Sequence, residues 1–564
     1  MNTESKRALI AAVRKVVFAG LILLAVWLIL FALRSAIPAN IIDLINQRLQ
    51  VPVSHDSAAW DWSRSLLKDG SVSSIIGERI GNTLAFIALC GIMSLIIAGI
   101  LLFIGTLISR ITQSPSWLAK LRGILRSILI SGGASIPLFV ISTILMVSFI
   151  NRWNWGVQGD SIWVLLWAAF ICSMLPAWLL VQTGHGIMAK RNGNIAGFKL
   201  AKEIGVRLLI RLLKLVGFII VVSILSEQDI ATPGLGRLLL SAVSSMDFPL
   251  IFGITWVVII IVLAVKLVAD LLEIAYNYSN KTASPIEQNL KESSLRFAVP
   301  KGWLIFALAL CAFIALLAVM APLLAPYGGN AIHLKDSLSP PSAKYILGTD
   351  QLGRDIFSRL LYGMRIDVPI GLVCAAVVSI VAFGWATLAA YCRKMNNWLG
   401  DTLEDLVMLP REIACAFPWL VLLLLIMSFR VDMSIVFVAF ISGLVILPRA
   451  AGMIQAAYHS SPDGKSWLRG LLWSIPTVFL FTTAGVIIYT TTISYLGFGV
   501  PPGVPELGSI LSGEGRAYTQ TAPWIVIWPG LSLTFIILVF VMTGDALLEW
   551  LGFRSKAVWS KTME

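Results

Sequence analysis

The sequence predicts an all-α integral membrane protein with about twelve transmembrane helices, arranged as two parallel six-helix halves. Of its 564 residues, 58% are hydrophobic and only 13% are charged, and the mean hydropathy is +0.86. This composition lies far outside the globular range. Runs of about 18 to 28 residues with almost no charge recur along the chain, and each is long enough to cross a bilayer core. The sequence lacks the alternating strand-length segments of a membrane barrel.

The first half is expected over residues 1–276 and begins with an uncleaved span. Lys6, Arg7, Arg14 and Lys15 flank an apolar run over 16–33, which is too long for a signal peptide and has no small-residue cleavage pattern. Basic flanks of this kind place the N-terminus in the cytoplasm. The further spans of this half are expected at 82–109, 124–150, 162–180, a segment that ends near 225, and 250–272.

Residues 277–302 are polar and are expected to form a cytoplasmic linker, after which the plan repeats over 303–564. Each half has a long first external loop, a basic loop after its fourth span and a Gly/Pro-rich loop before its last span. Because both halves begin on the same side, they form a parallel repeat about an axis along the membrane normal. The spans of the second half are expected at 303–324, 369–390, 414–427, 435–447, 471–489 and 525–548.

Positive charge is concentrated in the segments expected to be cytoplasmic. Roughly 28 of the 43 Lys and Arg residues fall there, as the positive-inside rule requires. The formal net charge of +13 is spread over short loops, so we expect membrane lipid, and not nucleic acid, as the partner of this charge. The six cysteines and four histidines show no metal-ligand spacing, and no metal site is expected.

The sequence contains no obvious means of powering transport by itself. Within the predicted spans the main ionisable residues are Lys266 and Asp270, which we expect to form a local pair near the inner interface. Ion-driven carriers place charges deeper in the membrane. The segment 459–466 resembles the tail of a phosphate-binding loop, but His459 replaces its first glycine and no strand precedes it. A Pro-Asp-Gly turn explains that segment better.

The densest run of positive charge lies over 194–214, between the fourth and fifth spans, and is expected to be cytoplasmic. As a helix, this run has a stripe of apolar and small residues at three- or four-residue spacing: Phe198, Ala201, Gly205 and Leu208. Its charged residues fall largely off that stripe: Lys199, Lys202, Glu203 and Arg207. Small residues let another protein approach the backbone closely. The alternative is an amphipathic helix that rests on anionic headgroups.

Several stretches resemble the permease subunits of bacterial dipeptide, oligopeptide and nickel ABC importers. Residues 345–363, YILGTDQLGRDIFSRLLYG, closely resemble the external loop of the second permease subunit, and 494–502, 521–524 and 544–545 resemble its last loop and final helix. The most specific positions are Gly348, Thr349, Asp350, Gly353, Arg354 and Asp355. The first half is similar to the partner permease at 33–38, 78–84, 233–237 and 247–249.

The resemblance implies that both permeases are fused in one polypeptide of the bacterial cytoplasmic membrane, with the fold of a type I ABC importer permease. The Lys/Arg distribution predicts that both termini are cytoplasmic. It also implies that the loop after the fourth span docks on an ATP-binding subunit, with the following residues in the coupling helix: Phe198, Ala201, Lys202, Glu203 and Gly205. In the second half only Gly464 matches, the loop is shortened and interrupted by proline, and 407–417 looks like an insertion. Coupling is therefore expected to be lopsided.

The same resemblance gives the expected partners. These are two ABC ATP-binding subunits, identical or different, and an extracytoplasmic substrate-binding protein. ATP and Mg²⁺ would bind in the partners, so this chain is expected to hold no cofactor and to have no enzymatic activity. Peptides are the expected substrate. The alternatives are import of nickel or another small ligand, a pseudo-permease that serves as a scaffold or sensor, and a secondary transporter, which the parallel repeat and the absence of a charge relay disfavour.

Overall fold

The computed structural model describes most of the chain, and every regular element in the described part is helical. The described residues are 3–35, 62–66, 70–111, 162–189, 198–230, 232–279, 301–393, 398–429, 434–459, 467–500, 503–512 and 521–551, with single positions at 37, 42, 43, 45, 47 and 518. Within them the only β-type pairings are two isolated bridges, Arg64 with Ser71 and Thr349 with Asp355. The all-α prediction is confirmed.

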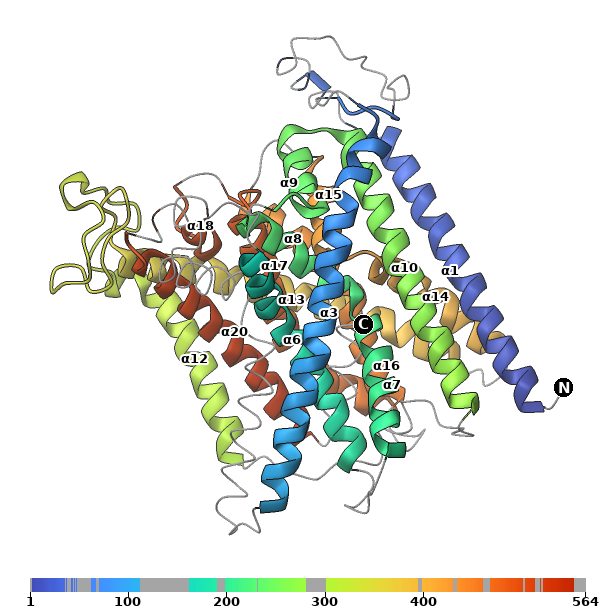
Figure 1. Cartoon of the computed structure of the whole chain (residues 1–564). Coiled ribbons are helices and arrows are strands. Elements are labelled where there is room, and N and C mark those ends of the chain that lie inside the picture. The colour runs from blue at the N-terminus through green and yellow to red at the C-terminus, as the bar shows by residue number, and fades with distance from the viewer. Residues whose placement is uncertain are drawn as a thin grey trace.

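The helices of the first half run from α1 to α10. Their bounds are α1 Thr3–Ser35, α3 Val72–Ile111, α6 Ile162–Ala189, α7 Phe198–Lys214, α8 Val216–Ile230, α9 Leu235–Ser245 and α10 Phe248–Ser279. The helices of the second half are α12 Lys301–Leu324, α13 Ile356–Arg393, α14 Trp398–Ala416, α15 Trp419–Met427, α16 Ile435–His459, α17 Trp467–Tyr495, α18 Leu507–Leu511 and α20 Trp524–Trp550, with a 3-10 turn η2 at Leu334–Asp336. In Figure 1, α1 and α12 lie on opposite sides of the bundle.

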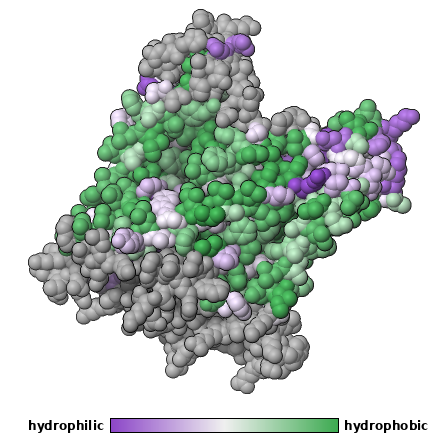
Figure 2. All heavy atoms as spheres, turned by 180° about the vertical axis from the view of Figure 1, so that it is seen from behind, coloured by the Kyte–Doolittle hydropathy of each residue, from purple (hydrophilic) through white to green (hydrophobic). Residues whose placement is uncertain are grey.

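Eight helices of the described part are long and apolar enough to cross a membrane, and the number rises to ten if each of two bent pairs is one span. The predicted fourth span falls on α6, whose apolar portion, Leu165–Val181, is shorter. The predicted third span, 124–150, lies outside the described residues. Large hydrophobic side chains on α1 and α12 are exposed, for example Phe31 at 57% and Leu323 at 81%. Figure 2 shows hydrophobic residues over most of one face, as expected of a lipid-facing surface.

The structure corrects several predicted span boundaries. The eighth span begins at Ile356 instead of 369, so 356–367 is helix and not loop. The tenth extends to His459, twelve residues beyond 447. Charged residues such as Arg359 and Asp367 made these helix ends look like loop in the sequence, but both side chains are buried against their own protein. Because these side chains contact protein and not water, the helix continues through them.

Two expected spans are sharply bent. α7 and α8 meet at 59°, and α14 and α15 meet at 84°. Pro418 stands at the N-cap of α15, where its missing N–H breaks no helical hydrogen bond. The region 407–417, which resembled an insertion, is therefore the end of α14 and the start of this bend.

A local arrangement occurs once in each half. The N–H of Leu235, at the start of α9, donates to Thr83 Oγ1 at 2.8 Å. The N–H of Leu507, at the start of α18, donates to Asp367 Oδ2 at 3.1 Å. Thr83 stands eleven residues after the first residue of α3, Val72, and Asp367 stands eleven residues after the first residue of α13, Ile356. The preceding sequences, PGLG at 233–236 and PELG at 505–508, also match. This correspondence supports the two-half plan.

Candidate functional site

α7 presents an open face of small residues. Ala201, Lys202 and Gly205 are exposed, and Leu209 is 42% exposed. A Cβ placed on Gly205 would meet no atom within 4 Å, so nothing in the described chain requires glycine there. Ala201, Gly205 and Leu209 follow at four-residue spacing and share one side of the helix. A second protein can approach the α7 backbone closely along this stripe.

The exposed stripe differs from the predicted one at its last position. Leu208 is buried at 5% exposure in a cluster that includes Leu102 and Leu212, and Leu209 takes its place on the outside. The two leucines lie about 100° apart on the helix, and the sequence could not decide between them. Phe198 begins α7, but its side chain lies outside the described residues. Glu203 is half-buried and pairs with Arg207 one turn later, at 3.1 Å.

Charged contacts attach α7 to α10 at two levels. The guanidinium of Arg207 lies 5.8 Å from the ring centroid of Tyr276. Two turns further along α7, Lys214 Nζ lies 2.6 Å from Glu273 Oε2 and 3.2 Å from Asp270 Oδ1. Two separated contacts resist rotation of α7 about either one. A partner that binds the open face of α7 would therefore move α10 with it.

The predicted local pair of Lys266 and Asp270 does not form. Asp270 Oδ2 lies 2.8 Å from Lys15 Nζ on α1, and Asp270 also contacts Lys214. Lys266 Nζ instead donates to the carbonyl oxygen of Cys415 on α14 at 3.0 Å. Helical spacing identifies neighbours on one helix only, so it could not reveal partners on α1, α7 and α14. Lys266 thus joins the two halves, and Asp270 joins three helices of the first half.

The corresponding end of the second half is organised around a buried carboxylate. Glu404 on α14 is 5% exposed. It accepts hydrogen bonds from Gln455 Nε2 on α16 at 2.7 Å and from Arg393 Nη1 at the end of α13 at 3.0 Å. These contacts fix three helices to one another just before the shortened loop. Gly464 itself lies outside the described residues.

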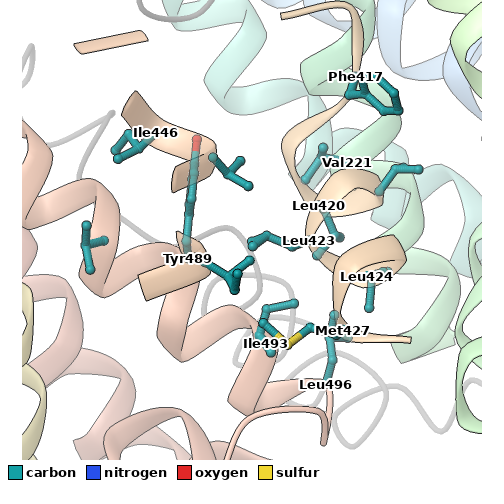
Figure 3. Packing of buried hydrophobic residues seen from close by; sticks show 14 of the residues in the cluster. Val221, Phe417, Leu420, Leu423, Leu424, Met427, Ile446, Tyr489, Ile493 and Leu496 are labelled. Atoms are coloured by element: carbon teal, nitrogen blue, oxygen red, sulfur yellow. The ribbon is translucent and has the colours of Figure 1, made fainter. Parts of the chain in front are cut away.

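α15 occupies the contact between the halves. It packs against α8, α9 and α10 on one side and against α16 and α17 on the other. Leu420, Leu423 and Leu424 are fully buried, and Figure 3 shows them between Val221 of α8 and Tyr489 of α17. α15 is thus a short apolar element shared by both halves.

Aromatic contacts close this interface at each end of α15. Trp419 stacks on Tyr489 with ring centroids 4.1 Å apart and an interplanar angle of 4°. Phe429, just beyond α15, lies 5.5 Å from Phe248 and 6.3 Å from Phe252 of α10, measured between ring centroids. The contacts of α15 with both halves thus form an apolar seal in the described part of the chain.

The stretch that carries the family resemblance forms a compact knot around Asp350. This carboxylate is 3% exposed. Its Oδ1 accepts the N–H groups of Leu352 and Arg354, both at 2.9 Å. Its Oδ2 lies 2.6 Å from Arg354 Nε and 2.5 Å from Arg359 Nη1. Arg354 and Arg359 are also buried. Charged side chains that look surface-directed in the sequence therefore neutralise each other inside the loop.

The remaining motif residues attach this knot to helices. Asp355 Oδ2 accepts from Ser358 N–H at 2.8 Å, as an N-cap of α13. The carbonyl of Thr349 accepts from Trp524 Nε1 at the start of α20, at 3.1 Å. Gly348 and Gly353 have φ of +83° and +70°, which other residues rarely adopt. The motif thus holds the projecting loop rigidly on α13 and α20.

The rest of the loop carries a second set of charged contacts around Asp336. Lys344 Nζ lies 2.7 Å and Tyr345 Oη 2.8 Å from Asp336 Oδ2. The hydrogen bonds from Lys344 and then Tyr345 lower the pKa of Asp336. The outer surface of this loop is hydrophilic in Figure 2, where it projects from the apolar body.

Sequence reasoning also missed Glu227, a buried acid at the end of α8. It is 3% exposed. Its Oε1 accepts from Thr83 Oγ1 at 2.8 Å, and its Oε2 accepts from Gly236 N–H at 2.6 Å. A predicted span that ended near 225 left this residue in a loop. The signal that could have identified it is the PGLG sequence that follows, because the N–H groups at a helix start attract a carboxylate.

The described residues contain no group of three or more His, Cys, Asp or Glu that could hold a metal ion. Their contacts leave an open face on α7, form an apolar seal at α15 and hold the external loop on α13 and α20.

Comparisons with known proteins show that the chain is similar to transport permease proteins. The chain is 31% identical over 291 residues to a dipeptide transport system permease protein, DppC, of Haemophilus influenzae, covering 47% of this chain and 95% of the relative. It is 30% identical over 290 residues to a di/tripeptide transport system permease protein of Pseudomonas aeruginosa, covering 47% and 93%. A nickel transport system permease protein, NikC, of Escherichia coli is 26% identical over 277 residues, covering 46% and 96%. No family model matches the chain.

The apolar helices and these relatives identify a multi-pass transport permease of the bacterial inner membrane. The relatives narrow this class, because the alignments cover nearly their full length at about 30% identity. The chain belongs to the permease family of bacterial dipeptide, peptide and nickel ABC transport systems.

Proposed function

We propose that this chain is the fused transmembrane permease of an ATP-driven importer of peptides. The observation that carries the proposal is the open small-residue face of α7, braced on α10, in a chain of this family. Residues 1–276 and 303–564 would be the two permease halves, joined by a cytoplasmic linker at 277–302. A relative that is covered to 95% of its length accounts for only 47% of this chain, which supports a second permease in the remainder.

The proposed partners follow from this architecture. ATP-binding subunits would dock on the α7 face, with Phe198, Ala201, Lys202, Glu203 and Gly205 at or near the contact. An extracytoplasmic substrate-binding protein would meet the opposite end, where the rigid loop 345–363 projects. ATP and Mg²⁺ would be held by the docked subunits, and this chain would contribute no cofactor site. Both termini would lie in the cytoplasm.

The geometry suggests how docking would open the path. A displacement of α7 is passed to α10 through Arg207 and Lys214, and to α8 through the bend at Leu215. α8 and α10 both pack against α15. Their movement would withdraw one wall of the apolar seal while α16 and α17 hold the other. Alternating access would then be a rigid movement of one half against the other.

A bulky substitution on α7 tests this proposal. Gly205→Trp should abolish transport-linked ATP hydrolysis and reduce recovery of the ATP-binding subunits on purification. Overpacking a tight contact typically costs about 1 to 3 kcal/mol, which weakens association roughly five- to a hundredfold. Because a Cβ at Gly205 meets no atom of the described residues within 4 Å, the chain should still fold.

Two controls make this test specific. Gly20→Trp introduces the same side chain at another open glycine, on α1, and should leave both readouts unchanged. Gly464→Trp should have a much smaller effect than Gly205→Trp if coupling rests mainly on the first half. Full activity in Gly205→Trp would contradict docking on α7. Equal losses at Gly205 and Gly464 would contradict lopsided coupling.

Substrate class is tested with the complete transporter in proteoliposomes. Uptake of a labelled dipeptide, dependent on ATP and on the binding protein, is the expected result. Uptake of nickel without peptide uptake would reassign the chain to the nickel branch, since a nickel permease is among its relatives. Gradient-driven uptake by the chain alone would make it a secondary transporter. ATP hydrolysis without any transport would indicate a scaffold or sensor.

A further inference from the structure

The outer helix of the second half, α18, is held by two buried acids that face each other. Asp367 on α13 is 4% exposed, and Glu506 at the N-cap of α18 is fully buried. Asp367 Oδ2 accepts from Leu507 N–H at 3.1 Å, and Glu506 Oε2 accepts from Ser509 N–H at 2.8 Å. Each carboxyl thus uses one oxygen to hold the same helix start.

The other oxygen of each acid makes no hydrogen bond of normal geometry within the described residues: Asp367 Oδ1 and Glu506 Oε1 are both buried. The hydroxyl of Ser494, at the end of α17, lies near Glu506 and makes no other hydrogen bond. The two side chains lie within hydrogen-bonding reach of each other. Two ionised carboxylates in this arrangement would repel and leave two buried acceptors unsatisfied. A proton between them satisfies both.

No cation offers an alternative explanation. Neither acid pairs with a Lys, Arg or His within the described residues. The elements packed against α18 are α13, α17 and α20. α13 contributes Tyr362 and Arg365, which line the adjoining cavity, and α17 ends at Tyr495. The first ionisable residue of α20 is Asp545, about 30 Å along the helix from Trp524.

A route for the proton lies beside the pair. A cavity of about 450 Å³ is lined by residues that include Ile366 and Pro505, the neighbours in sequence of Asp367 and Glu506. Asn330 and Arg365 supply polar groups at its wall, and Arg365 is exposed. Water in this cavity would come close to both acids without opening the helix bundle.

The first half provides an internal comparison. At the position that corresponds to Asp367 it has Thr83, whose hydroxyl accepts from Leu235 N–H and donates to Glu227, both at 2.8 Å. A single acid and a hydroxyl thus satisfy the start of α9 without an added proton. The second half has the same backbone arrangement but replaces the hydroxyl with a second acid.

We propose that Asp367 and Glu506 form a proton-binding site in which one shared proton holds α18 against α13, and that loss of this proton releases α18. Burial raises the pKa of Glu506 from 4.5 to about 7. The packed helix therefore binds more protons than the released helix between these values, so its stability is highest at low pH and falls as the pH rises through this window. The proposal is independent of the solute carried and of docking at α7.

Spin labels on the full chain in lipid vesicles test this site. In a background without the native cysteines, one label is placed at Ser512→Cys, at the end of α18, and a matched label at Ser241→Cys on α9. The mobility of the α18 label should be lowest below about pH 4.5 and should rise as the pH increases through about 7. The α9 label should not respond. The same transition at both labels, or none at α18, would contradict the proposal.

Three variants identify the groups responsible. Glu506→Gln and Asp367→Asn each replace the shared proton with an amide donor, and Asp367→Thr copies the first half. All three should keep the α18 label immobile across the whole pH range. If one variant fails to fold, the other two still test the proposal. Folding is followed by the α9 label and by gel filtration. A transition that persists unchanged in these variants would overturn the assignment.

Discussion

At the scale of single residues, several charged side chains of this protein are buried and join elements of the fold. Asp350 binds Arg354 and Arg359 within one loop, and Glu404 joins three helices. A carboxylate that receives several donors costs little to bury, whereas the same group with its partner removed is expensive. The motif around Asp350 therefore preserves the shape of the loop first, and any recognition by a partner would depend on that shape.

Asp350→Asn should destabilise the loop strongly, because it leaves two buried guanidinium groups without their carboxylate. Breaking a buried ion pair typically costs about 3 to 5 kcal/mol. Lys344→Ala, which breaks an exposed pair with Asp336, is the control and should have little effect. The measurement is the fraction of monodisperse protein after heating in detergent. Equal heat sensitivity of the two variants would show that the Asp350 network is not a stabilising element.

The motif residues could be recognised in the sequence, but the residues that they contact could not. The GTDxLGRD stretch was recognisable at 348–355, yet its inward-facing charges were not, since partners such as Arg359 and Trp524 depend on the fold. The expected Lys266–Asp270 pair shows the same limit, because spacing along one helix cannot reveal Lys15 or Cys415. Ala201 and Gly205 are exposed on α7, and their role in docking stays a prediction.

At the scale of elements, bends determine how the halves meet. The 59° bend between α7 and α8 and the 84° bend between α14 and α15 turn two expected spans into an angled pair each. The first bend connects the docking face to the bundle, and the second directs α15 into the interface. Hydropathy located the apolar residues of both pairs, but it carries no information about the direction of a helix axis. Pro418 alone did not specify the angle of the bend.

The contact of Phe248 with Phe429 leads to a prediction about the movement of α10 relative to α15. A short bifunctional maleimide that joins Phe248→Cys and Phe429→Cys should tie α10 to the end of α15, because the two rings are 5.5 Å apart. Transport should then stop while ATP binding continues, as the seal could no longer separate. The assay is ATP-driven uptake before and after treatment, with a monofunctional maleimide as control. Undiminished uptake by cross-linked protein would place the path elsewhere.

At the scale of the whole molecule, the starts of α9 and α18 are held in the same way, by Thr83 on α3 and by Asp367 on α13. The division into two parallel halves stays a prediction. Composition and hydropathy were sufficient to predict the helical class and most of the helices. They placed the ends of spans poorly, as at Ile356 and His459, where buried polar side chains extend the helix. The positions 124–150 and 464 lie outside the described residues and stay predictions.

Parallel halves require the linker and the projecting loop to lie on opposite sides of the membrane. Ser284→Cys in the linker should react with an impermeant thiol reagent from the cytoplasmic side, and Ala343→Cys in the exposed loop should react from the external side. Inverted and right-side-out vesicles provide the two measurements, with the native cysteines replaced. Labelling of both sites from one side would contradict the parallel plan and the cytoplasmic linker.

The starts of α9 and α18 also restrict which sequences this fold can tolerate over time. A Cβ on Gly234 would come within 2.2 Å of the Glu227 carboxyl carbon, and Glu506 occupies the position in the second half that Gly234 occupies in the first. A carboxyl can therefore reach a helix start from the preceding helix or from the cap residue, but the two cannot coexist in one half. Each choice makes the other substitution harmful. The two halves would therefore tolerate different substitutions at these positions.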